Sequence, residues 1–343
     1  MGLQIKKEII KRNSSILKAI VLSKNFNAYL VLVYRAISLI TRPIDCILHY
    51  VENLFINRVL FEEPIVIFVV GSHRSGATFV SQVIGSSFPL YNLGNFNSLF
   101  PRSRYIIHKI VRKKIVKSPK ISYSNYYGQS PSLFEIGDAH EVWDQWYGNN
   151  HNSVPDNIDL DIKIDMKNYF SSLYHVAKSP IITKSGRNSL NLTMLNEEFK
   201  KGLFVIVDRE LKDVVLSTLK ANKLFNDERG MWGLHAGSTK DSKRTSYIDN
   251  VVIQCIEVKN KIKEQIDTID SKKYLVVNYE DFCNEPKACL DAIGSLISKH
   301  STIFSSYEFN HNSVFSSKKY SGDIQLHKDV EASIKRNKRL CLT

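Results

Sequence analysis

The stretch from Ile65 to Gly85, "IVIFVVGSHRSGATFVSQVIG", constrains the fold of this 343-residue chain more than any other. A short, continuous run of apolar and β-branched residues precedes Gly71, which is typical of a strand buried on both faces of a parallel sheet. After Gly76 the apolar residues recur at helical spacing. We therefore expect a strand, a loop and a helix, an arrangement that offers backbone N–H groups and a helix N-terminus to an anion.

The chain after residue 180 repeats this pattern. The segments "PIITKS", "GLFVIVDRE" and "KYLVVNYEDF" are predicted strands, and "LKDVVLSTLKANKLF", residues 246–267 and "ACLDAIGSLISKH" are predicted helices. Strands that alternate with helices favour an α/β fold with a central parallel sheet flanked by helices. We assign this domain to residues 61–343, with residues 91–180 as an irregular insertion of loops and short helices over the ligand edge of the sheet.

Residues 1–60 form a predicted N-terminal helical extension. Apolar residues recur there three and four apart, at Leu30, Val33, Ile37, Ile40, Ile44, Ile47, Val51 and Leu54. Such a stripe suits a coiled-coil seam, a helix lying on a membrane, or an amphipathic helix packed on its own domain. Pro43 would kink a long straight helix. We favour packing on the domain, and self-association or peripheral membrane binding remain the alternatives.

The loop after the first strand lacks one residue of a nucleotide-triphosphate loop. Gly71, Gly76 and Thr78 have the right spacing, but Ala77 occupies the position of the Lys that reaches the β- and γ-phosphates. Arg74 is then the fixed cation within the loop. One hypothesis is an ATP- or GTP-dependent kinase or NTPase with a degenerate loop, for which Asp208, at the end of a later strand, supplies the acidic residue.

A second element points to the same edge of the sheet. Arg209 lies at a predicted strand end, and Ser217 follows eight residues later, in the next predicted helix. Both side chains can face one point beyond the sheet, where a guanidinium fork and a hydroxyl suit a phosphate.

The two elements together resemble the two signatures of the sulfotransferase superfamily, whose members use 3′-phosphoadenosine 5′-phosphosulfate (PAPS). The first is "RSGATF", and the second is "VDRELKDVVLSTLKAN". Ala77 and Leu211 depart from the usual residues. The segments "TKSGRNSLNLTML" and "LVVNYEDFCNEPKACLDAIGSLI" are similar to flanking segments of the family. The resemblance covers about residues 64–300 and implies the P-loop-NTPase-like sulfotransferase fold.

The resemblance also implies the donor site. In the family the first signature holds the 5′-phosphosulfate and the second holds the 3′-phosphate through its Arg and Ser. The implied PAPS-binding residues are Ser72, His73, Arg74, Ser75, Gly76, Ala77, Thr78, Phe79, Arg209 and Ser217. Arg74 is also the candidate for contact with the leaving oxygen. Transfer of the sulfuryl group leaves 3′-phosphoadenosine 5′-phosphate (PAP) and needs electrostatic stabilisation and in-line positioning, with no obligatory metal.

The acceptor hydroxyl needs a general base. The acidic and aromatic segment "LFEIGDAHEVWDQWYG" is similar to acceptor-site segments of bacterial carbohydrate-type members. Within it we favour Glu141, with His140 behind it, and His73 in the loop is a rival. The expected acceptor is therefore a carbohydrate or glycolipid hydroxyl.

The charge of the chain favours anionic partners. Lys and Arg outnumber Asp and Glu by 47 to 34, which gives a net charge of +13 and a pI near 9.3. The basic run from Arg102 to Lys120 suits an anionic acceptor, membrane head groups or plain solvation, and Lys318 and Lys319 could add to the 3′-phosphate site. A non-catalytic anion- or nucleic-acid-binding protein is the remaining hypothesis, although no zinc spacing or nucleic-acid module is recognisable, so we expect no specific nucleic acid partner.

Five scattered cysteines without a CxxC pair favour reduced thiols. No uninterrupted apolar run approaches the length of a membrane span. We expect a cytoplasmic protein, either free or peripheral to a membrane.

Overall fold

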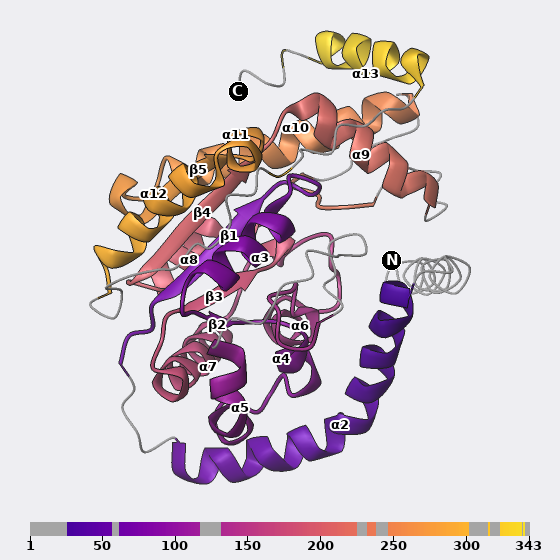
Figure 1. Cartoon of the computed structure of the whole chain (residues 1–343). Helices are drawn as coiled ribbons and strands as arrows, with labels where there is room; N and C mark the ends of the chain where they lie inside the picture. Colours follow the sequence, from indigo (N-terminus) through magenta and orange to yellow (C-terminus); the bar gives the residue numbers. More distant parts are fainter. Residues whose placement is uncertain are drawn as a thin grey trace.

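A five-stranded, all-parallel sheet forms the centre of the molecule (Figure 1). This computed structural model describes residues 26–56, 62–116, 132–224, 232–237, 246–301, 315, 323–337 and 339. The strand order is β2-β3-β1-β4-β5. The strands are β1 (Val66–Gly71), β2 (Tyr91–Asn92), β3 (Ile181–Lys184), β4 (Gly202–Asp208) and β5 (Tyr274–Asn278). The predicted α/β fold with a central parallel sheet flanked by helices is confirmed.

The middle strand β1 is buried along its whole length. It pairs with β3 on one side, where Ile67 lies opposite Ile182, and with β4 on the other, where Ile67 lies opposite Leu203. A strand with partners on both edges and helices on both faces has no solvent-exposed side, which is why its sequence is continuously apolar. Its carboxyl end therefore reaches the edge of the sheet between the ends of β3 and β4.

Helices cover both faces of the sheet (Figure 1). One apolar layer joins the sheet to α3 (Ala77–Ser87), α11 (Tyr279–Asn284) and α12 (Pro286–Ser298). The opposite layer joins it to α6 (His140–Tyr147), α7 (Leu160–Ala177), α8 (Leu192–Glu198) and α10 (Tyr247–Ile266). A third cluster packs α9 (Leu211–Leu224), α10 and α13 (Ile324–Arg336) together. Short 3-10 turns, η1 (Gly186–Leu190) and η2 (Ser271–Lys273), complete these layers.

The region 91–180 is more regular than its sequence predicts. It contains α4 (Asn95–Leu99), α5 (Ile106–Val116), α6 and the 18-residue helix α7. The expectation of loops and short helices is therefore wrong for 160–177. There Met166, Tyr169, Phe170 and Leu173 are buried against the sheet layer that contains β1. The aromatic and polar mixture obscured this helical period, and tertiary packing stabilises the helix.

The N-terminal extension contains helix α2 (Phe26–Ile56), which includes Pro43 and wraps around the outside of the domain (Figure 1). The expectation that its apolar stripe packs on the domain is wrong. Seven of the eight stripe residues carry exposed side chains, namely Val33, Ile37, Ile40, Ile44, Ile47, Val51 and Leu54. Polar residues form the side that faces the domain instead, with Ser38, Asp45 and Glu52 buried.

Among the described residues, no helix is both long enough and apolar enough to span a membrane.

Candidate active site

The loop between β1 and α3 has a glycine at each end, Gly71 and Gly76, where a larger residue would clash or be strained. A Cβ on Gly71 would lie 2.5 Å from the carbonyl oxygen of Val207 and 2.6 Å from Ser75 Oγ. Gly76 has a φ of 93°, in the left-handed region that favours glycine, and Arg74 also has a positive φ, of 63°. The chain thus turns twice and enters α3 directly.

The N-terminus of α3 suits an anion. Its N-cap residue is Gly76, no side chain caps it, and the first turn contains no acidic residue. The first N–H groups of a helix lack partners within the helix and carry a partial positive charge. Ser75, immediately before, has a buried hydroxyl without a hydrogen-bond partner among the described residues. These groups fit the phosphate end of a nucleotide.

The side chains of the loop have different roles. Ala77 is buried in the apolar layer beneath α3, and the ring of Phe79 packs edge-on against Phe315, with their centroids 4.9 Å apart. At these two positions only the backbone is suited to hold a ligand. Ser72 is buried and its carbonyl accepts the Ser75 N–H at 3.1 Å, which closes the turn. The side chain of Thr78 is partly exposed at the first turn of α3.

His73 is directed away from solvent, toward α10 and the segment 232–237. Its Nδ1 accepts the Leu234 N–H at 3.4 Å, and its Nε2 lies 3.6 Å from Cys255 Sγ. Burial, followed by the charges of His235 and Arg74, lowers the pKa of His73 to about 3. The imidazole is therefore neutral at pH 7, and its side chain positions the loop, so His73 is a weak candidate for the general base.

The second motif meets the loop through two hydrogen bonds. Arg74 Nε donates to Ser217 Oγ at 2.8 Å, and Arg209 NH1 donates to the carbonyl oxygen of Arg74 at 3.3 Å. Arg209 directly follows β4, and Ser217 lies in α9. The structure therefore brings Arg74, Arg209 and Ser217 together from segments more than 130 residues apart.

Arg209 is held by aromatic and acidic neighbours. Its guanidinium carbon lies 4.6 Å from the centre of the Tyr279 ring, and it forms ion pairs of 3.7 Å with Asp213 and Glu280. Burial raises the pKa of Tyr279 to about 12, so this ring stays a neutral phenol. The same ring packs against Gly76, where a Cβ would lie 2.3 Å from two of its carbons. Tyr279 thus couples the two motifs, a role that sequence reasoning did not identify.

Residues after β3 support the loop from the other side. Ser189 Oγ accepts the Gly71 N–H at 3.0 Å and donates to the Gly71 carbonyl at 2.9 Å. Near it, the buried Ser185 Oγ and both amide atoms of Asn188 have no partner among the described residues. Unpaired buried polar atoms are uncommon in folded proteins, and a bound water or ligand can satisfy them. These residues lie in the quoted segment "TKSGRNSLNLTML", which is the signal that could have identified them.

The family comparison agrees with this geometry. Residues 64–297 match the protein family described as the sulfotransferase family. The chain belongs to the sulfotransferase family.

Solved structures of sulfotransferases show a related fold. Sulfotransferase STF9 from Mycobacterium avium is 12% identical, with a TM-score of 0.50 over 85% of this chain and 81% of that chain. Sulfotransferase STF1 from Mycobacterium tuberculosis H37Rv is also 12% identical, with a TM-score of 0.49 over 94% of this chain and 91% of that one. Among curated proteins, no sequence matches the chain significantly.

In this member of the sulfotransferase family, the predicted acceptor-side segment lies at the carboxyl edge of the sheet. Asp138 forms a 2.6 Å ion pair with Lys184, the last residue of β3. Helix α6 begins two residues later, and Glu141 lies in its first turn. Glu141 is partly exposed and forms no hydrogen bond or ion pair with the described residues.

The other polar side chains of this segment are engaged. His140 stacks on His151, with ring centroids 4.2 Å apart, and burial together with that neighbour lowers the pKa of His140 well below 6.5. Asp144 contacts Arg187 at 2.6 Å and His151 at 3.1 Å. Burial alone would raise the pKa of Asp144, but these two partners lower it. Asp144 therefore stays an anion and has a structural role.

The aromatic residues of the segment are buried. Trp143, Trp146 and Tyr147 are at most 3% exposed and belong to the apolar layer between α6, α7 and the sheet. These rings pack in the core because the apolar face of α6 is the face that the fold buries, and the acceptor site itself stays a prediction.

Two sequence-based expectations fall outside the described residues. Lys318 and Lys319 lie there, as does the C-terminal part of the basic run, residues 117–120.

Proposed function

We propose that this chain is a PAPS-dependent sulfotransferase that transfers a sulfuryl group to a hydroxyl of a carbohydrate or glycolipid. The observation that carries the proposal is the pair of hydrogen bonds from Arg74 to Ser217 and from Arg209 to Arg74, which join the two signature motifs. PAPS carries a phosphate on the 3′ position of its ribose and a phosphosulfate on the 5′ position, so its binding needs two adjacent anion sites. The uncapped N-terminus of α3 supports one of them, and Arg209 with Ser217 supports the other.

The chain's own residues fit this donor. We assign the 5′-phosphosulfate to the backbone from Ser75 to Phe79 with Thr78, and the 3′-phosphate to Arg209 and Ser217. Arg74 stabilises negative charge on the oxygen that leaves the sulfur, and because a guanidinium keeps its proton, it acts by charge and not as an acid. The unpaired Ser75 hydroxyl is a further hydrogen-bond donor at that end.

We assign the general base to Glu141. In the reaction the acceptor oxygen bonds to sulfur, the bond from sulfur to the bridging oxygen breaks, and the acceptor proton passes to the Glu141 carboxylate. Glu141 is supported because it is partly exposed at the edge of the sheet and has no competing partner among the described residues. His140, whose pKa is lowered well below 6.5, is too weak a base for this step.

A degenerate kinase is disfavoured by Asp208. Its carboxylate forms a 2.7 Å ion pair with Lys259, which also donates to the carbonyl oxygen of Arg209 at 2.9 Å. A kinase would need Asp208 to bind magnesium. Here Asp208 instead pairs with the lysine that holds the backbone of Arg209 in the second motif. We propose a cytoplasmic location, in line with the free thiols of Cys46, Cys255, Cys283 and Cys289.

The donor assignment is tested with Arg209→Ala. Removing a charged hydrogen-bond partner should weaken PAP binding by roughly 10- to 100-fold. Binding of adenosine 5′-phosphosulfate, which lacks the 3′-phosphate, should change far less. Arg336→Ala, on the exposed surface of α13, is the matched control and should leave both affinities unchanged. Equal weakening of both ligands by Arg209→Ala would refute the assignment of the 3′-phosphate.

The base is tested with Glu141→Gln. Loss of general base catalysis should lower kcat with PAPS by about 10²- to 10⁴-fold, while PAP affinity stays unchanged. Sugar and glycolipid acceptors are assayed side by side by transfer of radiolabelled sulfate from PAPS. If Glu141→Gln keeps full kcat on every acceptor that the wild type sulfates, Glu141 is not the base.

A further inference from the structure

Helix α2 presents its apolar side to solvent. Eight large apolar side chains between Leu39 and Phe55 are exposed, and Ile40, Tyr50 and Ile47 are 73%, 69% and 64% exposed. At about 100° per residue, these side chains cover roughly half of the helix circumference. An exposed apolar face of this extent marks an interaction site. Figure 1 shows α2 on the outside of the molecule, along the region of α4 and α5.

Buried hydrogen bonds fix this orientation of α2. The Asp45 carboxylate accepts the Ser103 N–H at 2.8 Å. The Glu52 carboxylate accepts the Ser103 hydroxyl at 2.7 Å, and the N–H groups of Arg104 at 2.8 Å and Ile106 at 2.6 Å, at the start of α5. Rotating the helix to hide its apolar side would turn both carboxylates out to solvent and leave these donors buried without an acceptor, at a cost of several kcal/mol.

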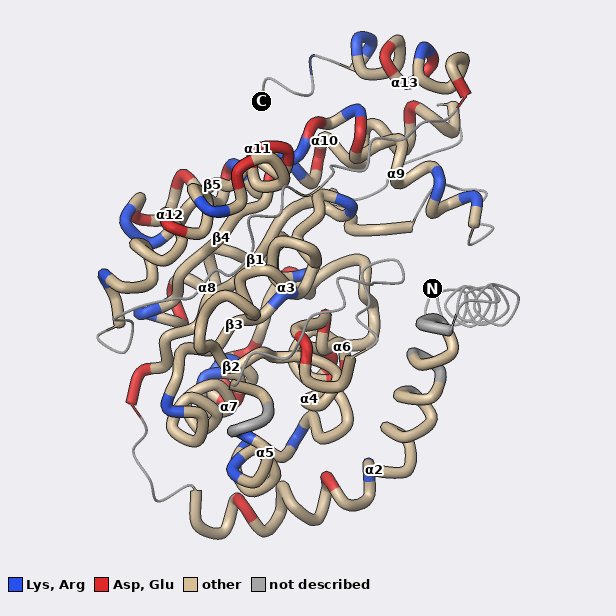
Figure 2. Tube along the Cα trace, in the orientation of Figure 1, with Lys and Arg blue, Asp and Glu red and all other residues tan. Residues whose placement is uncertain are grey.

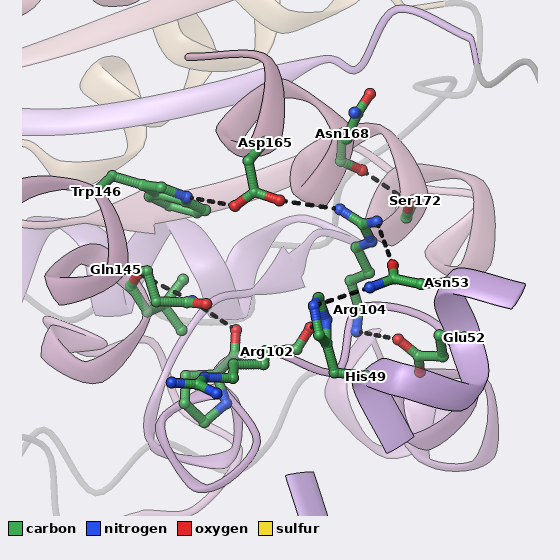
Figure 3. A network of polar contacts seen from close by, with 12 residues as sticks. His49, Glu52, Asn53, Arg102, Arg104, Gln145, Trp146, Asp165, Asn168 and Ser172 are labelled. Atoms are coloured by element: carbon green, nitrogen blue, oxygen red, sulfur yellow. Dashed lines mark hydrogen bonds and ion pairs between the residues drawn. The ribbon is translucent and has the colours of Figure 1, made fainter. Parts of the chain in front are cut away.

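A second network connects α2 to the helices beneath it (Figure 3). Arg104 donates to Asn53 of α2 at 2.9 Å and pairs with Asp165 of α7 at 3.3 Å. Asp165 in turn accepts the Trp146 indole N–H of α6 at 2.9 Å. The apolar side of α2 is therefore held outward by the domain itself.

The charges around this face select a partner. The only carboxylates of α2, Asp45 and Glu52, face inward and are buried. Helix α5 packs against α2, and its Lys109 and Ile110 are exposed. The run 102–120 contains eight Lys or Arg, of which Arg104 is buried and faces inward, and no Asp or Glu. Figure 2 shows α2 almost free of charged positions, with basic positions on α5 nearby.

We propose that the outward face of α2, from Leu39 to Phe55, docks this protein on the surface of an anionic phospholipid bilayer. The apolar side chains enter the boundary between head groups and acyl chains, and basic residues such as Arg42 and Lys109 contact the anionic head groups. A second copy of the chain would place two basic surfaces against each other, whereas anionic lipid supplies both the apolar and the negatively charged partner.

The test is flotation of the full chain with vesicles of phosphatidylcholine alone or mixed with phosphatidylglycerol. Wild type should bind the mixed vesicles, and added salt should weaken this binding. The triple variant Ile40→Glu, Ile47→Glu and Leu54→Glu should lose roughly tenfold in partitioning per substitution. The matched control carries the same number of added charges on exposed apolar residues of α9, β5 and α13, as Leu224→Glu, Val276→Glu and Ile324→Glu. It should bind like wild type.

A second readout does not depend on the triple variant. Tyr50→Trp places an indole on the exposed face, and its fluorescence should shift to the blue on adding mixed vesicles and be quenched by brominated lipid. Sedimentation velocity without lipid should show a monomer. Absence of vesicle binding by wild type, equal binding by the two triple variants, or a dimer that the α2 triple variant dissociates would each overturn the proposal.

Discussion

Replacing Gly76 by Ala probes the joint between the two halves of the site. A Cβ at this position would lie 2.3 Å from Cδ2 and Cε2 of Tyr279, far inside van der Waals contact. The backbone cannot relax easily, because Gly76 is the N-cap residue of α3 and its φ of 93° sets the direction in which the helix leaves the loop. Tyr279 must therefore move, and with it the guanidinium of Arg209 that lies 4.6 Å from its ring centre.

The expected loss of stability has two parts. A non-glycine residue in the left-handed region costs about 1–2 kcal/mol. Forcing a methyl group into a packed contact typically costs about 1–3 kcal/mol more. The sum is about 2–5 kcal/mol, which corresponds to roughly 3–7 °C in Tm for a chain of this length. PAP affinity should fall together with stability, because Arg209 leaves its place.

Urea unfolding followed by circular dichroism measures the loss, and titration calorimetry measures PAP affinity. Gly137→Ala is the matched control, since its Cβ would lie no closer than 3.7 Å to any neighbour and its φ is not positive. If Gly76→Ala is destabilised no more than Gly137→Ala, the loop is not held between Gly76 and Tyr279 as described, and the coupling of the two motifs is refuted.

Three further predictions concern the loop, the core and α2. Ala77→Lys restores the residue of a nucleotide-triphosphate loop. It should lower the urea midpoint, because position 77 is buried among apolar side chains. ATP with Mg²⁺ should not stabilise the variant, and stabilisation by ATP with Mg²⁺ would argue for a kinase. Burial lowers the pKa of His108 to about 4, so the folded state resists its protonation. As the pH falls from 6.5 to about 4, His108 alone should lower the free energy of unfolding by up to about 1.4 kcal/mol per pH unit. In His108→Gln the contribution of this one proton should disappear, so the free energy of unfolding should depend less steeply on pH. An unchanged pH dependence would contradict the lowered pKa of His108. Glu52→Ala should destabilise the protein by about 3 kcal/mol in urea, because several buried donors lose their acceptor, whereas Glu264→Ala on the exposed face of α10 should have little effect.

The parallel sheet and the alternation of strands and helices along the chain were predictable, because buried parallel strands have a strong local signature. The strand before Gly71 and the strand before Arg209 are both continuously apolar, and the structure buries them side by side. Strand β2 was not predictable, because two residues, Tyr91 and Asn92, carry no periodicity and pair only through the fold.

The meeting of the two motifs that we propose as the donor site was predictable for a related reason. Arg74, Arg209 and Ser217 lie at fixed distances from strand ends, and strand ends of a parallel sheet meet at one edge. Their direct hydrogen bonds confirm that the two motifs meet. Tyr279 and Ser189 were missed as parts of the site, because their roles depend on packing against glycines that are distant in sequence.

The orientation of α2 could not be read from its apolar period. Periodicity identifies a face and does not say whether that face turns toward the domain or away from it. Here the deciding residues are Asp45 and Glu52, whose carboxylates find backbone donors at the start of α5, a long-range match with no local signal.

The central claim is that the joined motifs bind a nucleotide with a 3′-phosphate, and a thermal unfolding series tests it most directly. PAP at about 100 times its Kd should stabilise the protein by about 2.7 kcal/mol, or roughly 4 °C in Tm. ADP, and ATP with Mg²⁺, should produce a much smaller shift at the same concentration. A shift with ATP and Mg²⁺ but none with PAP would contradict the account.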